Sequence, residues 1–210
     1  MDSADAIIET LKQVVPGLAA TFGRSCEIVL YDYRNSDRSV VAVSGEVTGR
    51  HAGGATSEIG LRMLARGDDA EPALNYVTRA ASGRTVKSST MPLRDGHGKV
   101  FGALCVNLDV TALRQVSDML ADLAGLTPAA PPPATTFTDD FEEVVDAVVR
   151  AEELALAKPV GSLTRRERLP LLKVLDERGV FTVRGAAPRV AARLGISRAS
   201  LYTDLAECRK

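Results

Sequence analysis

The most constraining feature of this sequence is a stretch near its C-terminus, residues 187–206, which reads APRVAARLGISRASLYTDLA. Its apolar residues form two short stripes of helical spacing, separated by Gly195 and Ser197. Glycine ends a helix readily because it lacks a Cβ atom, and serine is a good N-cap for the helix that follows. The stretch therefore predicts the two helices and tight turn of a helix-turn-helix. An ordinary helical hairpin is the alternative, but it does not account for all of these spacings together.

A helix-turn-helix places the N-terminal residues of its second helix in the DNA major groove. The side chains expected to face inward are Val190, Leu194, Ile196, Leu201 and Leu205. Those expected to face DNA are Ser197, Arg198, Ala199, Tyr202 and Thr203. Arg198 is the best candidate for a guanine contact, with Tyr202 and Thr203 reaching bases or backbone. The arginines expected to hold phosphates, without reading sequence, are Arg184, Arg189 and Arg193.

The charge of the chain is unevenly distributed along its length. Residues 158–210 hold 12 Lys/Arg and 5 Asp/Glu, a balance of +7, whereas residues 1–157 hold 14 and 22, a balance of −8. A basic C-terminal segment on an acidic body is expected when only that segment meets phosphates. The charge pattern and the helix-turn-helix motif therefore point to the same partner, double-stranded DNA.

The composition is that of an ordinary globular protein, with 45% hydrophobic and 25% charged residues. No apolar run approaches the length of a membrane span, and the N-terminus is acidic and amphipathic rather than a secretion signal. The cysteines, which are Cys26, Cys105 and Cys208, form neither a zinc-binding spacing nor a disulfide framework. We therefore expect a cytoplasmic protein without a membrane partner, metal or cofactor.

The first 125 residues predict a mixed domain built on an antiparallel sheet. An amphipathic helix is expected at 4–21, and strand-like runs lie at 26–33, 39–45, 83–93 and 99–109. The last two runs are joined by Asp-Gly-His-Gly, which is a strong hairpin signal. Short helices are expected between the strands, at 56–66 and 70–82. This order is typical of a PAS-type sensor domain, an α+β fold in which small helices cover one face of the sheet.

The remaining chain predicts helices and a linker. Apolar spacing predicts helices over 110–124 and 139–157, separated by a Pro/Ala/Thr-rich segment at 126–138 that reads as a semi-rigid linker. Thr164 and Glu167 have the spacing of a capping box at the start of a further helix. We therefore divide the chain into a sensor domain (1–125), a linker (126–138) and an all-α domain with the helix-turn-helix (139–210).

Several motifs in order resemble the bacterial YheO-like regulators, which join a PAS-type domain to a helix-turn-helix. They are Phe22-Gly23, Cys26–Asp32, Thr48–Arg50 with Gly53, Asn75-Tyr76, Lys87–Thr90, Cys105–Asp109, Gly179–Phe181 and Arg184–Ala186. Tyr31 and Ser44 depart from the family, where histidine and asparagine are more common. The resemblance covers nearly the whole chain apart from the linker and implies a transcriptional regulator with a PAS fold.

The sensor half offers one candidate ligand site. Arg50 precedes the glycine-rich turn Gly53-Gly54, which runs into the start of a helix, and a guanidinium near free backbone N–H groups suits a carboxylate. The hypothesis is a small polar metabolite, such as an amino acid, bound by Arg50, Thr56, Ser88 and Asn107. The alternative is that Arg50 pairs with Asp32 or Glu27 and that the glycines only turn the chain.

Other function classes have less support. The run Gly23–Cys26 is similar to the cysteine motif of flavin-binding photosensory domains, but here a strand follows where those domains have a helix. The chain lacks the nucleophile-elbow, phosphate-loop and zinc-protease motifs, and it has only two histidines, His51 and His97. We therefore expect no catalytic residues. A PAS-type interaction or signalling module without direct DNA contact stays open, and a salt-dependent mobility shift on DNA tests it.

The expected mechanism combines ligand sensing with dimerisation. Apolar stripes on helix 110–124, and on helix 139–157, are expected to pack between two subunits, although they could equally pack on their own sheet. A homodimer places two recognition helices about one DNA turn apart, which predicts a palindromic operator. A small-molecule effector regulates such a dimer only if it favours one arrangement over another.

Overall fold

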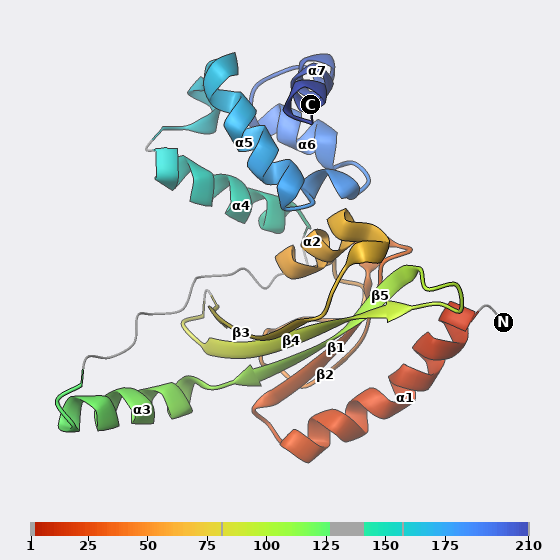
Figure 1. Ribbon diagram of the computed structural model, residues 1–210, viewed down its shortest axis with the longest axis vertical. Coiled ribbons are helices and arrows are strands. Elements are labelled where there is room, and N and C mark those ends of the chain that lie inside the picture. Colours follow the sequence, from red (N-terminus) through yellow and green to blue (C-terminus); the bar gives the residue numbers. More distant parts are fainter. Residues whose placement is uncertain (1–2, 81, 127–140, 157, 210) are drawn as a thin grey trace.

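The computed structural model describes residues 3–80, 82–126, 141–156 and 158–209. An antiparallel sheet with helices forms the N-terminal part, and helices alone form the C-terminal part (Figure 1). The N-terminal elements are α1 (Ser3–Phe22), β1 (Cys26–Asp32), β2 (Val40–Ser44), α2 (Glu58–Arg66), β3 (Ala73–Arg79), β4 (Thr85–Arg94), β5 (Val100–Asp109) and α3 (Thr111–Leu123). The predicted α+β class is confirmed.

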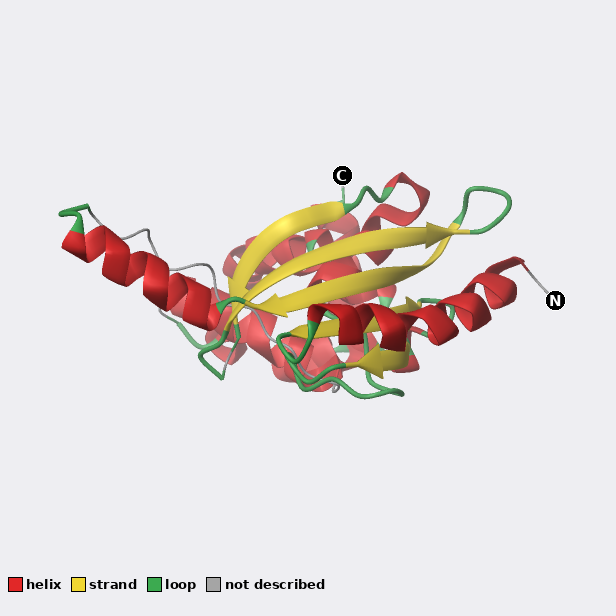
Figure 2. Cartoon of the chain, turned by 90° about the horizontal axis from the view of Figure 1, so that it is seen from below, coloured by secondary structure: helices red, strands yellow, loops and turns green. Residues whose placement is uncertain are grey.

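The sheet has five strands in the order β2-β1-β5-β4-β3, each antiparallel to its neighbours. Successive side chains of a strand point to opposite faces. On one face Ile28 and Leu30 of β1 pack against Ile8 and Val15 of α1, which lies along the sheet (Figure 2). The opposite face carries polar residues together with Tyr31, and α2 packs there through Met63. One face of the sheet is therefore apolar and packs against α1, whereas the other is partly polar and packs against α2.

One predicted element is wrong. Residues 70–82 were expected to form a helix, but Ala73–Arg79 form β3, which pairs with β4. The side chains of Tyr76–Thr78 are aromatic or β-branched and fit a pleated sheet, and the pairing satisfies backbone groups that β4 would otherwise expose. Asn75 has a φ of 57°, at a register shift between Ala73 and Tyr76. This bulge breaks the period of two that identifies a strand in sequence.

The C-terminal part consists of α4 (Phe141–Leu156), α5 (Arg165–Glu177), α6 (Ala186–Arg193) and α7 (Arg198–Cys208), with the short 3-10 turn η4 (Val180–Thr182) before α6. The predicted capping box is present, since the backbone N–H of Thr164 donates to the Glu167 carboxylate at 2.8 Å. These helices share one buried core. The predicted linker lies outside the described residues from position 127 onward.

Two helices are placed unusually. Figure 1 shows α2 between the sheet and the C-terminal helices, and the core of those helices includes Ala55 and Leu61 from the α2 region. In contrast, α3 projects away from the rest of the molecule (Figure 1), and none of its residues is buried. Its exposed apolar side chains are Leu113, Val116, Met119, Leu120 and Leu123. The helix predicted at 110–124 therefore exists, but it does not pack on its own sheet.

Candidate functional site

The turn between α6 and α7 exposes the start of α7 to solvent. Gly195 has a φ of 66° after α6, a conformation that favours glycine, and the Ser197 hydroxyl caps α7 by accepting from the Ser200 N–H at 3.1 Å. The apolar residues that join the two helices are buried or half-buried, and they are Val190, Leu194, Ile196, Leu201 and Leu205. The structure thus forms the tight helix pair that the sequence predicts.

The predicted DNA-facing residues of α7 come together on its outer surface. Ser197, Arg198, Ala199, Tyr202 and Thr203 are all exposed. Tyr202 is 58% exposed, which is high for an aromatic side chain. Within the described part of the chain, the Arg198 guanidinium has no hydrogen bond or ion pair and is available to an outside partner. This arrangement presents donors at a helix N-terminus, as major-groove reading requires.

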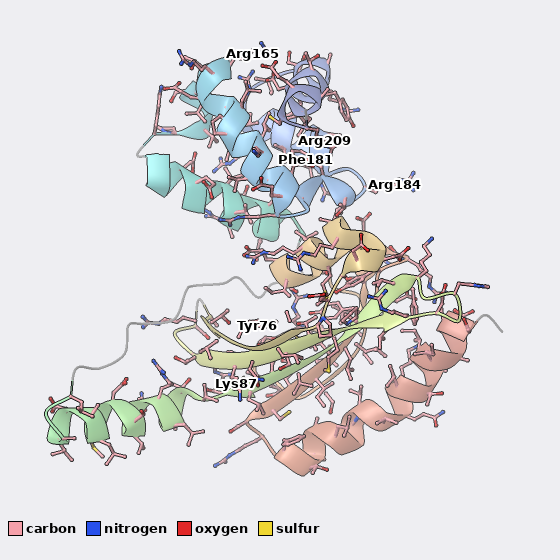
Figure 3. The ribbon with its side chains drawn as sticks, in the orientation of Figure 1. Tyr76, Lys87, Arg165, Phe181, Arg184 and Arg209 are labelled. Carbon is pink, nitrogen blue, oxygen red and sulfur yellow. The ribbon has the colours of Figure 1, made fainter. Side chains whose placement is uncertain are left out.

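The three arginines predicted to contact phosphates differ in their surroundings. Figure 3 shows Arg184 projecting outward just before α6, and its side chain is exposed. Arg193, on α6, lies 3.7 Å from Asp146 and 3.9 Å from Glu153, both on α4. Arg189 and Arg193 both line a pocket of about 390 Å³ between α4 and α6. DNA phosphates would therefore have to compete with the carboxylates of α4 for Arg193.

A buried ion-pair cluster that the sequence did not reveal holds α7 in place. Asp204 of α7 is 2% exposed and accepts from Arg165 at 2.7 Å and from Arg168 at 2.7 and 3.0 Å, both on α5. Burial raises the pKa of Asp204, but hydrogen bonds from the two guanidinium groups lower it more, so the pKa lies below its usual value. Helix α7 is therefore fixed against α5 by charge as well as by apolar packing.

The face of the sheet opposite α1 carries a network of hydrogen-bonded polar side chains. Asn107 of β5 donates to Glu27 of β1 at 3.0 Å and accepts from Ser88 of β4 at 2.7 Å. The backbone N–H of Thr48 also donates to the Glu27 carboxylate, at 2.9 Å. All three strand residues are at most 2% exposed. Buried polar groups are costly unless they are paired, so this network fixes the polar face in one arrangement.

The network extends toward β3 and toward Arg50. Thr90 donates to the Cys105 thiol at 3.2 Å and lies 2.8 Å from the hydroxyl of Tyr76, which Figure 3 marks on the sheet. Burial raises the pKa of Cys105 above its usual value, although the hydrogen bond with Thr90 and the nearby Arg50 guanidinium lower it in part. Cys105 is also 3.4 Å from Asn107. The sequence did not single out Tyr76 or Thr90 as site residues, although the polar residues along β4 were a usable signal.

Arg50 and Thr56 lie at the α2 end of the same face. Arg50 is 3% exposed, donates to the Ala55 carbonyl at 2.5 Å, and lies 5.8 Å from the centre of the Tyr31 ring. Burial raises the pKa of Tyr31, whereas Arg50 lowers it. The Thr56 hydroxyl is fully buried without a hydrogen-bond partner in the described chain. The four predicted ligand residues therefore lie on one buried face. Of these four, only Arg50 lines the pocket of about 510 Å³ that opens beside it, whose other lining residues in the described chain belong to 43–52.

The alternative partners of Arg50 have their own contacts. The Asp32 carboxylate accepts a hydrogen bond from Arg34 at 2.7 Å, and the Glu27 carboxylate accepts hydrogen bonds from Asn107 and Thr48. Both carboxylates thus have contacts of their own, and the pairing of Arg50 with one of them stays an alternative prediction.

Comparison with known proteins matches both parts of the chain. A model of the YheO-like PAS domain matches residues 2–125, which is more than half of the chain, and a model of an HTH domain matches residues 143–206. The chain belongs to the YheO-like PAS family. The predicted resemblance to this family and the predicted PAS-type fold are therefore confirmed.

Relatives of this YheO-like protein align along nearly its whole length. YheO of Escherichia coli K12 is 30% identical over 203 residues, covering 93% of this chain and 82% of YheO. A Haemophilus influenzae protein of unknown function is 29% identical, covering 96% and 90%. The transcriptional regulator DauR of Pseudomonas aeruginosa PAO1 is 25% identical over 209 residues, covering 99% of this chain and 97% of DauR. Each of these alignments thus spans both parts of this chain.

The remaining candidate residues of this YheO-like protein are Cys26 and the two histidines. Cys26 packs in the core beneath α1, on the face opposite the polar network, where burial raises its pKa. His51 and His97 are both exposed. Among the described residues, no group of three His, Cys, Asp or Glu side chains is placed to hold a metal ion. No helix in the described ranges is long and apolar enough to cross a membrane.

Proposed function

We propose that this YheO-like protein is a cytoplasmic transcriptional regulator whose PAS-type domain senses a small polar metabolite and controls DNA binding by its helix-turn-helix. The observation that carries the proposal is the exposed N-terminal surface of α7, where Arg198 and Tyr202 point to solvent over a well-packed turn. The related DauR, named a transcriptional regulator, supports it. The proposal assigns sensing to residues 1–125 and output to residues 139–210, joined by the linker 126–138.

For the DNA contacts we propose two roles. Arg198 reads a guanine, and Ser197, Ala199, Tyr202 and Thr203 complete the surface that faces bases and backbone. Arg184, Arg189 and Arg193 bind phosphates, which positions the protein without reading sequence. For Arg193, this role requires its guanidinium to leave Asp146 and Glu153.

These two roles predict different phenotypes for two arginine variants. Arg198→Ala is expected to relax base preference at one position by about 1–3 kcal/mol, because a bidentate contact to one base is lost. Arg189→Ala is expected to weaken binding to all sequences about equally and to reduce the salt dependence. Randomised-site selection and mobility shifts over a salt series measure both effects. The same change in base preference and affinity in both variants would contradict the two proposed roles. Salt-independent or absent DNA binding by the natural protein would favour the alternative function, an interaction module without DNA contact.

For the effector we propose a small molecule with a carboxylate, such as an amino acid. Arg50 supplies the positive charge for the carboxylate, and Thr56, Ser88 and Asn107 supply hydrogen bonds. Glu27, held beside Asn107, places negative charge on the same face, which suits an ammonium group. The unpartnered, fully buried hydroxyl of Thr56 supports this site, because buried polar atoms normally have a partner.

Calorimetry with a panel of amino acids and small carboxylic acids tests this site. For any compound that the natural protein binds, Arg50→Ala is expected to weaken binding about tenfold or more, since a charged hydrogen bond contributes more than 1.4 kcal/mol. Arg38→Ala, at an exposed position on the same domain, is the matched control and is expected to bind normally. Unchanged binding in the Arg50 variant would reject the site.

The proposed regulator acts as a homodimer through α3. Its apolar residues Leu113, Val116, Leu120 and Leu123 repeat at intervals of three and four, the pattern of a coiled-coil seam. Pairing two such seams covers exposed apolar surface that this chain leaves open. The expectation that helix 139–157 also packs between subunits is not met, because Val145, Val148 and Val149 of α4 are buried in the core that α4 shares with α5, α6 and α7. Two recognition helices then meet a palindromic operator with half-sites about one helical turn apart.

A further inference from the structure

Helix α2 contacts both the sensing face and the DNA-binding part of the molecule. Toward the sheet, Met63 packs with Tyr31, Tyr33 and Cys105. Toward the C-terminal helices, Leu61 is fully buried in their core. Figure 1 shows the helix between these two layers. One short helix is therefore part of two cores.

The sensing side of α2 is tightly constrained. Arg50 donates to the Ala55 carbonyl, and Ala55 and Thr56 lead directly into the Ser57 N-cap, which accepts from the Gly60 N–H at 3.2 Å. A Cβ atom at Gly60 would lie 2.0 Å from the Thr56 hydroxyl oxygen and 3.0 Å from the Tyr33 hydroxyl oxygen. Any group that enters this end of the polar face therefore acts on the start of α2.

The output side of α2 is equally close. Gly179, which precedes η4 and has a φ of 77°, approaches so near that a Cβ atom there would lie 2.1 Å from the Leu61 carbonyl oxygen. The adjacent Arg178 lies 3.5 Å from Glu58, the first residue of α2, and 3.1 Å from Glu152 of α4. Backbone contact and charge thus join α2 to the segment that leads into the helix-turn-helix.

We propose that α2 couples the polar face to the helix-turn-helix, so that a change at Arg50 and Thr56 is transmitted through Glu58 and Leu61 to Arg178 and Gly179. Close-packed interfaces do not deform gradually, so a small displacement of α2 favours a different seating of the C-terminal helices. This inference gives the proposed sensing site its route of regulation and rests on that proposed function. It also makes a prediction that needs no ligand.

The test perturbs α2 from the sensing side and measures amide hydrogen exchange in the full-length chain. Gly60→Val, with Gly60→Ala as the milder variant, crowds Thr56 and Tyr33, since the three atoms nearest to an added Cβ atom belong to these two residues. We expect amides of residues 180–194 to exchange about fivefold faster or more, the lower end of common allosteric coupling. Retained protection in β1 and β5 shows that the sheet remains folded.

The matched control is Val15→Ala, which weakens the packing of α1 on the other face of the sheet. It is expected to lower the thermal midpoint without changing exchange in residues 180–194. The reverse experiment uses Arg178→Ala, which removes the contacts to Glu58 and Glu152 and is expected to speed exchange in Glu58–Arg66, since coupling is reciprocal.

Two results would overturn the inference: natural exchange rates at 180–194 in both Gly60 variants, or equal acceleration by Val15→Ala. These outcomes are independent of the effector. If calorimetry rejects the Arg50 site while the Gly60 variants accelerate exchange, the proposed ligand is wrong and the coupling stands. If a ligand binds at Arg50 while exchange is unchanged, the proposed sensing site stands and α2 is not its route.

Discussion

Replacing Leu120 with aspartate is expected to convert the protein from a dimer to a monomer and to reduce its affinity for a two-half-site operator roughly 100-fold or more, because the second half-site is no longer bound in an intramolecular step. Leu120 is 57% exposed on α3, and no residue of that helix is buried in the chain. The substitution therefore places a charge in the proposed subunit interface without disturbing the core of the monomer.

Light scattering and mobility shifts on full-size and half-site duplexes measure these effects. Gln115→Asp is the matched control, since it adds the same charge about 120° around the helix from the seam, outside the expected contact. The control is expected to stay dimeric. A Leu120→Asp protein that remains dimeric with natural affinity would move the subunit interface away from α3.

Replacing Asp204 with asparagine is expected to destabilise the C-terminal helices by about 3–5 kcal/mol, because it leaves a buried guanidinium without its counter-charge. Arg168 is 8% exposed and donates two hydrogen bonds to Asp204. Thermal and urea unfolding measure the loss. The matched control is Asp176→Asn, which breaks the more exposed pair between Asp176 and Arg209 and is expected to cost about 1 kcal/mol or less.

The same cluster predicts a pH dependence with a definite sign. Because the pKa of Asp204 is lower in the folded protein than in the unfolded chain, its contribution to stability is present above the unfolded value of about 3.9 and is lost as the pH falls below it. Asp204→Asn should therefore lose stability at pH 7 and differ less from the natural protein near pH 3. A constant difference between pH 7 and pH 3 would show that the ion pair is not the source.

The parts of this fold that sequence predicts well are those with strong local signals. The pattern of residues 187–206 encodes the helix-turn-helix through apolar spacing, Gly195 and Ser197, and the structure forms it with those residues in those roles. The strands that became β1, β2, β4 and β5 were also predicted to within two residues. In contrast, β3 was missed because a bulge at Asn75 interrupts its alternation.

The parts that sequence misses depend on contacts between distant residues. Asp204 lies 36 residues from Arg168, and nothing in its local sequence marks it as buried. Gly179 resembles an ordinary helix-ending glycine, yet its lack of a side chain lets Leu61 approach, more than a hundred positions earlier in the chain. For the polar face, alternation placed Asn107 on one side of its strand, but only the register shows that Ser88 and Glu27 are its neighbours.

In the proposed function, the outer surface of α7 reads DNA in a symmetric dimer. Selection of binding sites from a random-sequence duplex library by the full-length protein tests it most directly. We expect enrichment of a palindrome whose half-sites are centred about 10–10.5 base pairs apart, with binding that weakens steeply as salt rises. Recovery of no preferred sequence, or of sites without two-fold symmetry, would contradict it.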